Sequence, residues 1–135
     1  MAPRYLLDTN TCIYLSQRRP ENVVQHFARL KPGEASISVV TYGELSYGVE
    51  KRPPSLESLE RLEELATLLP VLPLTLETAK AYGSIRADLE RTGRLIGGND
   101  LWIAAHARAE GLTLVTNNLK EFRRVRGLKL ENWIT

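Results

Sequence analysis

A short apolar segment near the start of the chain ends at a carboxylate and leads directly into residues that begin helices. Tyr5 to Leu7 is apolar, Asp8 follows, and Thr9 and Asn10 are both compatible with a helix start. An acid in this position lies at the carboxyl edge of a sheet, where open α/β folds bind their ligands. The segment therefore predicts an α/β fold with a site at that edge.

Short apolar strands alternate with helical patterns along the rest of the sequence. We expect strands at residues 5–8, 35–40, 71–72, 112–115 and 128–130. We expect helices at residues 10–16, 21–30, 41–51, 56–69, 76–91, 100–109 and 117–122. This alternation predicts a parallel sheet with helices on both faces, in one domain over residues 1–135.

Composition excludes several classes of protein. The 135 residues are 43% hydrophobic and 25% charged, which is typical of a globular chain, and no apolar run approaches the length of a membrane span. The single cysteine, Cys12, has no partner in the chain and fits a reducing compartment, and no signal peptide is visible. We therefore expect a cytoplasmic protein without a membrane anchor. The net charge of +2 permits a nucleic-acid partner without arguing for one.

Three carboxylates, Asp8, Glu44 and Asp100, and the amide of Asn118 fall at junctions between predicted strands, loops and helices. Asp8 follows the first strand, Glu44 lies a turn beyond the second, and Asn118 follows the strand at 112–115. The carboxyl ends of parallel strands face the same way, so these three residues should reach one edge of the sheet. Asp100 joins them if the loop at Gly97–Gly98 bends its helix start toward that edge.

Carboxylates gathered at one site repel each other. At about 4 Å and an effective dielectric near 20, each pair costs about 4 kcal/mol. A hard divalent cation removes that cost, and oxygen ligands select Mg²⁺ or Mn²⁺ rather than zinc. Such an ion can lower the pKa of a bound water and stabilise the charge of a phosphodiester during cleavage.

Each acid also has a structural interpretation. Asp8 can cap a helix, Thr41 and Glu44 match a capping box, and Asp100 can interact with a helix dipole. All three acids nevertheless fall at the junctions of one sheet, which favours a shared site over three separate structural roles.

The sequence resembles the PIN domain, and specifically the ribonuclease toxins of VapBC toxin–antitoxin modules. The matching segments follow one another in family order and at family spacing over nearly the whole chain. They are residues 6–10, 38–45 with 47–48, 98–107, 114–118 with 121–122, and 125–133.

The resemblance implies a PIN fold with a central parallel sheet of about five strands, and an endoribonuclease dependent on Mg²⁺ or Mn²⁺. It implies that Asp8, Glu44 and Asp100 are catalytic metal ligands. The fourth catalytic position, often Asp in the family, is Asn118 here, which adds no charge. Among the residues expected to support the site, Thr9 and Thr116 would hold a carboxylate or water, and Glu121 is a candidate to supply the missing charge.

The resemblance also implies partners. Such toxins form homodimers and are silenced by a cognate VapB-type antitoxin within a toxin–antitoxin hetero-oligomer. The substrate would be RNA, with transfer RNA and ribosomal RNA both fitting the family. Arginines are our candidates for contacts to the RNA backbone: Arg18, Arg19, Arg86, Arg94, Arg123, Arg124 and Arg126.

Two other functions stay open from the residues alone. A PIN-fold module that binds RNA without cleaving it is favoured by Asn118. An aspartyl-phosphate phosphotransferase also begins with a strand that ends in Asp. A dehalogenase-type site needs a second acid at position 10, where the chain has Asn10, and a receiver domain needs an acidic pair after its first strand.

Overall fold

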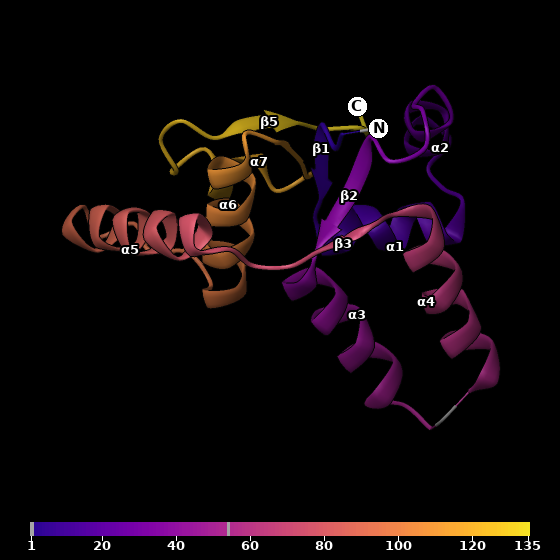
Figure 1. Ribbon diagram of the computed structural model, residues 1–135. Coiled ribbons are helices and arrows are strands. Elements are labelled where there is room, and N and C mark those ends of the chain that lie inside the picture. The colour runs from indigo at the N-terminus through magenta and orange to yellow at the C-terminus, as the bar shows by residue number, and fades with distance from the viewer. Residues whose placement is uncertain (1, 54) are drawn as a thin grey trace.

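The computed structural model describes residues 2–53 and 55–135, in which strands and helices alternate (Figure 1). The strands are β1 (Tyr5–Leu7), β2 (Ala35–Ser38), β3 (Val71–Leu72), β4 (Thr113–Val115) and β5 (Lys129–Glu131). The helices are α1 (Thr9–Gln17), α2 (Glu21–Ala28), α3 (Val39–Glu50), α4 (Leu56–Leu68), α5 (Leu76–Arg91), α6 (Gly98–Glu110) and α7 (Leu119–Phe122). The expected order of elements is confirmed.

The five strands form one parallel sheet in the order β3-β2-β1-β4-β5. The central strand β1 pairs with β2 on one side and β4 on the other, so that Leu6 lies opposite Ser36 and Leu114. From β1 the chain builds the sheet outward through β2 and β3, and later through β4 and β5 in the other direction. The strand order therefore switches between β1 and β4, and parallel sheets bind ligands in the crevice at such a switch point.

Neighbouring residues of the central strands enter two different hydrophobic cores. Leu6 and Leu114 pack in a core with residues of α5, α6 and α7, whereas Leu7 and Val115 pack in a core with residues of α1, α2 and α4. Successive strand side chains point to opposite faces, so this division places helices on both faces of the sheet (Figure 1). The predicted α/β architecture is confirmed.

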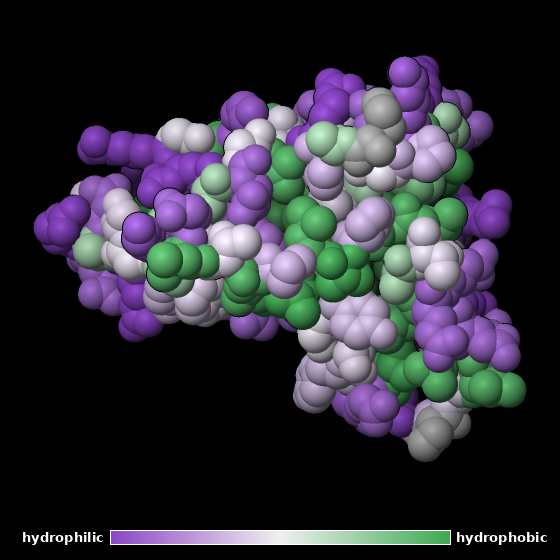
Figure 2. All heavy atoms as spheres, viewed as in Figure 1, coloured by the Kyte–Doolittle hydropathy of each residue, from purple (hydrophilic) through white to green (hydrophobic). Residues whose placement is uncertain are grey.

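The leucines of α4 divide between core and surface. Leu62 and Leu65, with Leu69 just after the helix, are buried. Leu56 is 73% exposed and Leu68 is 50% exposed. Figure 2 shows apolar side chains at the surface near the start of α4. The leucines of α4 therefore belong to the core along only part of the helix.

The second strand is shorter than expected. Val39 and Val40 were predicted as strand, and the following helix was predicted to begin at Thr41. In the structure β2 ends at Ser38, whose hydroxyl accepts a hydrogen bond from the Val40 N–H and caps α3. Ser38 supplies the side-chain cap that Thr41 was expected to supply, so the helix begins two residues earlier.

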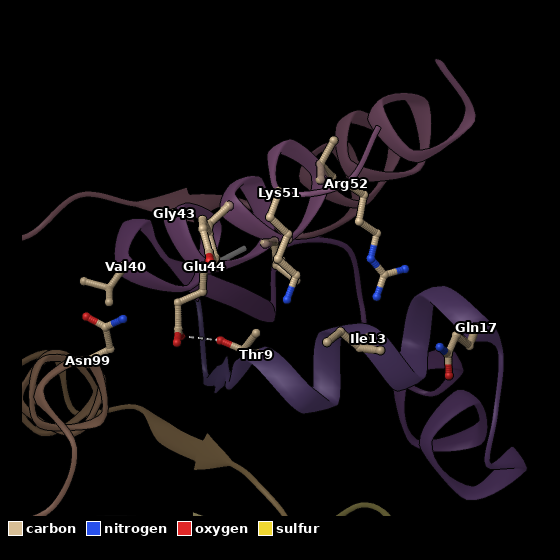
Figure 3. Close-up of a pocket in the computed structure, with 13 residues that line it drawn as sticks. Thr9, Ile13, Gln17, Val40, Gly43, Glu44, Lys51, Arg52 and Asn99 are labelled. Carbon is tan, nitrogen blue, oxygen red and sulfur yellow. Dashed lines mark hydrogen bonds between the residues drawn. The ribbon is translucent and has the colours of Figure 1, made fainter. Parts of the chain in front are cut away.

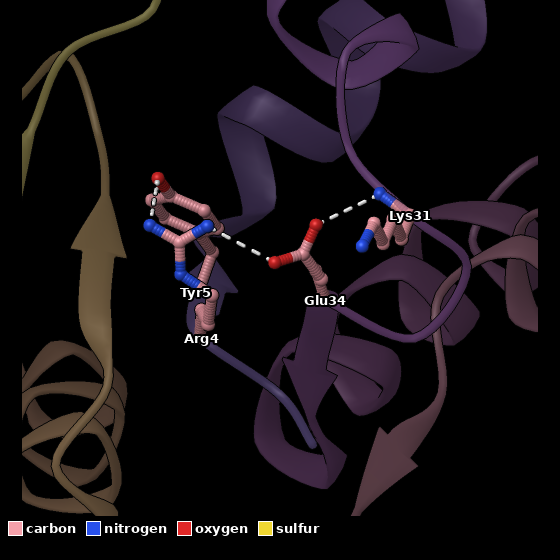
Figure 4. A network of polar contacts seen from close by, with 4 residues as sticks. All are labelled: Arg4, Tyr5, Lys31 and Glu34. Atoms are coloured by element: carbon pink, nitrogen blue, oxygen red, sulfur yellow. Dashed lines mark hydrogen bonds and ion pairs between the residues drawn. The ribbon is translucent and has the colours of Figure 1, made fainter. Parts of the chain in front are cut away.

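The edge of the sheet opposite the carboxyl ends carries an ion pair. Arg4 donates to Glu34 at 3.0 Å, and the Lys31 backbone N–H donates to the other carboxylate oxygen at 2.8 Å (Figure 4). The pKa of Glu34 is lowered, first by the Lys31 hydrogen bond and then by Arg4. This network closes the loop into β2. Across the described residues, none of the helices combines the length and apolar character needed to cross a bilayer.

Candidate active site

Asp8 lies where β1 passes into α1, at the switch point of the sheet. Its carboxylate accepts a hydrogen bond from the Thr11 N–H at 2.9 Å and so caps α1, and the residue is only 6% exposed. Burial raises the pKa of Asp8, and the charge of Glu44 adds to the rise, against hydrogen bonds from Thr116 and Thr11. The cap expected for Asp8 is present, and the same carboxylate faces other acids.

Glu44 reaches the same edge from α3. The Thr9 hydroxyl donates to its carboxylate at 2.5 Å, which joins the first turn of α1 to α3 (Figure 3). The interpretation of Glu44 as the acid of a capping box is wrong, because the helix cap is Ser38 rather than Thr41. The Glu44 side chain is therefore held by a neighbouring helix and not by the backbone at the start of its own.

Asp100 lies in the first turn of α6, because the helix begins at Gly98 rather than at Asp100 itself. Burial raises the pKa of Asp100 to about 7, together with a hydrogen bond and the charge of Glu121. The charges of Glu44 and Asp8 raise it further. The loop before α6 thus brings Asp100 within electrostatic reach of both other predicted acids.

Asn118 and Glu121 act together beside Asp100. The Asn118 side-chain amide donates to Glu121 at 2.7 Å, and the backbone N–H of Gly97 donates to its other oxygen at 3.3 Å. Burial would raise the pKa of Glu121, but these hydrogen bonds, one from Asp100 and the charge of Arg124 lower it. Asn118 therefore orients a fourth carboxylate that lies beside the three predicted ones.

Thr116 supports the loop after β4. Its hydroxyl accepts the N–H of Asn118 at 3.0 Å, and it also hydrogen-bonds Asp8. Thr9 and Thr116, selected from the sequence as supporting residues, thus contact Glu44 and Asp8 respectively.

The acids are spread along the edge of the sheet and do not converge on one position. Within residues 2–53 and 55–135, no three acidic, histidine or cysteine side chains are gathered as a ready-made set of ligands for an ion. Mg²⁺ commonly needs only one or two protein carboxylates and keeps several waters. Burial first, and the charges of nearby acids second, raise the pKa values of Asp8 and Asp100. Carboxylate oxygens are the donors that such an ion prefers. The residues present therefore fit a hard divalent cation.

The predicted arginines mostly lie away from these acids. Arg18 and Arg19 line a hollow between α1, α2 and α4, and Arg86 pairs with Glu90 on the surface of α5. Arg124 is the exception, because its charge lowers the pKa of Glu121. Of the other three, Arg94 and Arg126 accept side-chain hydrogen bonds through their carbonyls, and Arg123 is exposed.

A groove that opens beside Glu44 contains residues that sequence reasoning missed. It runs between α1 and α3, and Lys51 and Arg52 lie along it, with Asn99 at the start of α6 (Figure 3). The spacing of seven residues between Glu44 and Lys51 places them on one face of a helix, and this signal was available in the sequence.

Comparison with known proteins agrees with this architecture. A family model described as PIN domain matches residues 5–128. The chain therefore belongs to the PIN-domain family.

Within that family its relatives are VapC ribonucleases. It is 43% identical to a Haemophilus influenzae protein named ribonuclease VapC2, over 97% of this chain and 98% of the relative. It is 42% identical to a Shigella flexneri protein named tRNA(fMet)-specific endonuclease VapC, over 96% and 98%. The crystal structure of DNA-bound VapBC from Salmonella typhimurium superposes with a TM-score of 0.90 at 40% identity, covering 97% of this chain and 98% of the other.

Proposed function

We propose that this protein is a Mg²⁺- or Mn²⁺-dependent endoribonuclease and the toxin of a VapBC-type toxin–antitoxin pair. The observation that supports the proposal is that Asp8, Glu44 and Asp100 lie near one another at the carboxyl edge of the sheet, where Thr9 holds Glu44 and Asp8 caps α1. Burial and the neighbouring acids raise the pKa of Asp100 to about 7. Perturbed carboxyls that face each other in a crevice are typical of catalytic sites. The kinship with named VapC ribonucleases gives the reaction class.

Asp8, Asp100 and Glu44 are the residues that would hold the cation, with Glu121 beside them. A bound divalent ion supplies positive charge that stabilises the phosphate during cleavage and acidifies a water for attack.

The side chains themselves prepare this site. Asp8 is fixed in place by its role as the cap of α1, and Thr9 orients Glu44. Asn118 and the Gly97 N–H orient Glu121, which hydrogen-bonds Asp100. Burial and this neighbour raise the pKa of Asp100, whereas hydrogen bonds, first of all the one from Asn118, lower the pKa of Glu121.

The proposed partners follow from the relatives. The name of the Shigella flexneri relative specifies transfer RNA, and transfer RNA or ribosomal RNA is the substrate we propose here. The Salmonella typhimurium structure is a VapBC complex, and we propose that a cognate VapB-type antitoxin inhibits this chain. We also propose that the chain forms a homodimer and is located in the cytoplasm.

The proposal is tested by Asp→Asn substitutions, which remove the charge of a side chain and keep its shape. Asp8→Asn keeps a good helix cap while it removes a carboxylate, and Asp100→Asn removes the buried acid. Both variants should lose RNA cleavage in Mg²⁺ by at least about a hundredfold, the scale of a lost electrostatic contribution at an active site. Cleavage of total RNA by purified protein, with and without EDTA, measures this.

Glu57→Gln is the matched control, since Glu57 is exposed on α4, where it pairs with Arg61. It should cleave RNA like the parent protein. Undiminished cleavage by Asp8→Asn or Asp100→Asn would end the proposal. A PIN-fold module without catalysis would instead bind RNA without cutting it and show no affinity for Mn²⁺.

A further inference from the structure

An open groove begins at Glu44, one of the acids of the candidate site, and leads away from it along α3. It has a volume of about 880 Å³ and lies between α1 and α3. Thr9 and Glu44 stand at one end, and Ile13 and Gln17 line the α1 side (Figure 3). Lys51 and Arg52 extend from the end of α3 toward α1 at the other end.

One face of α3 changes from acidic to basic along this groove. Glu44 and Lys51 are seven residues apart, which is two helical turns and about 10 Å along the axis. Tyr47 lies between them, with 66% of its surface exposed, and the Lys51 ammonium lies 5.5 Å from the centre of its ring. A negative site for cleavage is thus followed by an exposed aromatic ring and then by two cations.

We propose that this groove binds the RNA strand next to the scissile phosphate. Lys51 and Arg52 contact the backbone phosphates that follow the cleavage site, and the Tyr47 ring stacks on an unpaired base. The inference rests on the proposed function, because it places the substrate of that same site.

Charge and continuity favour RNA as the occupant. Single-stranded nucleic acid binds where a cationic groove is combined with exposed aromatic rings. The cations line the same groove as Glu44, so a strand with its phosphate at the acids would continue past Tyr47 to Lys51 and Arg52. An acidic protein segment is the competing occupant, and the experiment below separates the two.

Two glycines provide a direct test, because one lies in the groove and the other does not. Gly48 lines the groove on α3, and Gly83 lies in α5. A Cβ at either position meets no heavy atom within 4 Å, so both sites accept a side chain without a clash. Both glycines lie within helices, where leucine is the more favourable residue. Gly48→Leu and Gly83→Leu should therefore both keep or raise Tm, while only Gly48→Leu fills the groove.

The measurement is binding of a fluorescein-labelled single-stranded RNA, followed by anisotropy in the Asp8→Asn background so that the RNA stays intact. Gly48→Leu should lose most of the RNA affinity, and Gly83→Leu should keep it. Tyr47→Ala should weaken binding at least about fivefold, as expected for one lost stacking contact, while Tyr47→Phe should retain it.

The salt dependence identifies the phosphate contact. Lys51→Ala should reduce the slope of log affinity against log salt by about 0.7, the value for one phosphate on a single strand. Lys80→Ala is the control, because Lys80 is exposed on α5 and pairs with Glu77. It should leave the slope unchanged.

Equal RNA affinity in Gly48→Leu and Gly83→Leu, with an unchanged slope in Lys51→Ala, would overturn the inference. If the RNA affinity is equal and Gly48→Leu instead loses binding of the purified cognate antitoxin, the groove binds protein rather than RNA. That outcome would also overturn the inference. Neither result touches the proposed function, which depends on metal-dependent cleavage by the parent chain.

Discussion

The carboxyl group of Asp100 keeps its proton to a higher pH than an ordinary aspartic acid. Burial raises its pKa from an ordinary value of 3.8 to about 7, with Glu121, Glu44 and Asp8 adding to the rise. In the unfolded chain the Asp100 carboxyl loses its proton near pH 3.8, whereas in the folded protein it keeps the proton up to about pH 7. The stability associated with the proton is therefore complete below pH 3.8 and is lost as the pH rises to 7.

Asp100→Asn removes this pH dependence at a single residue. Without divalent ions, the variant should gain stability relative to the parent as the pH rises from 4 to 8, because a neutral amide has no charge to be buried or repelled by the other acids. Thermal unfolding in EDTA across this range measures the difference. Glu57→Gln, in an exposed pair, should follow the parent curve. A difference between Asp100→Asn and the parent that stays constant with pH would contradict the assignment.

The residue types of the site could be selected from the sequence, but their pairing could not. Asn118 was read as a lost charge, and Glu121 as a candidate replacement. The structure places the Asn118 amide on the Glu121 carboxylate, so that the two residues act as a unit. This contact depends on the turn between β4 and α7, which has no periodic pattern from which side-chain directions can be read.

The position of the cap of α3 decides the structural role of Glu44. With the cap at Thr41, Glu44 would occupy the position of a capping glutamate. With the cap at Ser38, Glu44 lies in the second turn and accepts the Thr9 hydroxyl. Both serine and threonine are good caps, so local propensity could not choose between them.

The Ser38 hydroxyl joins α3 to α6 as well as capping α3. It accepts the Val40 N–H at 3.1 Å and shares a hydrogen bond of 2.8 Å with Nδ1 of the buried His106. Burial lowers the pKa of His106, so the ring is neutral at pH 7. The helices that carry Glu44 and Asp100 are thus connected by a buried bond.

Ser38→Ala tests this connection. The variant should lose about 1 kcal/mol for the cap and about 1–3 kcal/mol for the histidine nitrogen left without a partner. Ser55→Ala is the matched control, because Ser55 caps α4 at the surface, with its hydroxyl accepting the Ser58 N–H. The control should lose only the cap contribution. Urea unfolding of both variants gives the comparison, and equal losses would show that the bond to His106 contributes nothing.

At the scale of the whole molecule, the order of the strands creates the acidic crevice. Placing β4 beside β1 sets the loop that carries Asn118 next to Asp8, and α6 then brings Asp100 from the other direction. The crevice concentrates negative charge in a protein of net charge +2. We therefore expect the folded state, rather than the unfolded chain, to be the form that binds the proposed cation.

Cation binding should therefore stabilise the fold as a whole. Mn²⁺ at a hundredfold excess over its dissociation constant should raise the free energy of unfolding by about 2.7 kcal/mol, provided that the unfolded chain does not bind it. Thermal unfolding with increasing Mn²⁺ measures the gain, which Asp8→Asn should reduce or abolish and Glu57→Gln should retain. An equal gain in Asp8→Asn would place the ion elsewhere.

The sequence by itself determined the alternation of strands and helices, the two-faced sheet, and the acids at the ends of strands, because these follow from local periodicity and from the direction of parallel strands. Only the tertiary structure decided that Ser38 caps α3, that Glu121 contacts Asp100 and Asn118, and that a groove with Lys51 and Arg52 leads away from Glu44. These features depend on contacts between residues distant in the chain. Such contacts are set by packing of whole elements, which no local pattern of residues specifies.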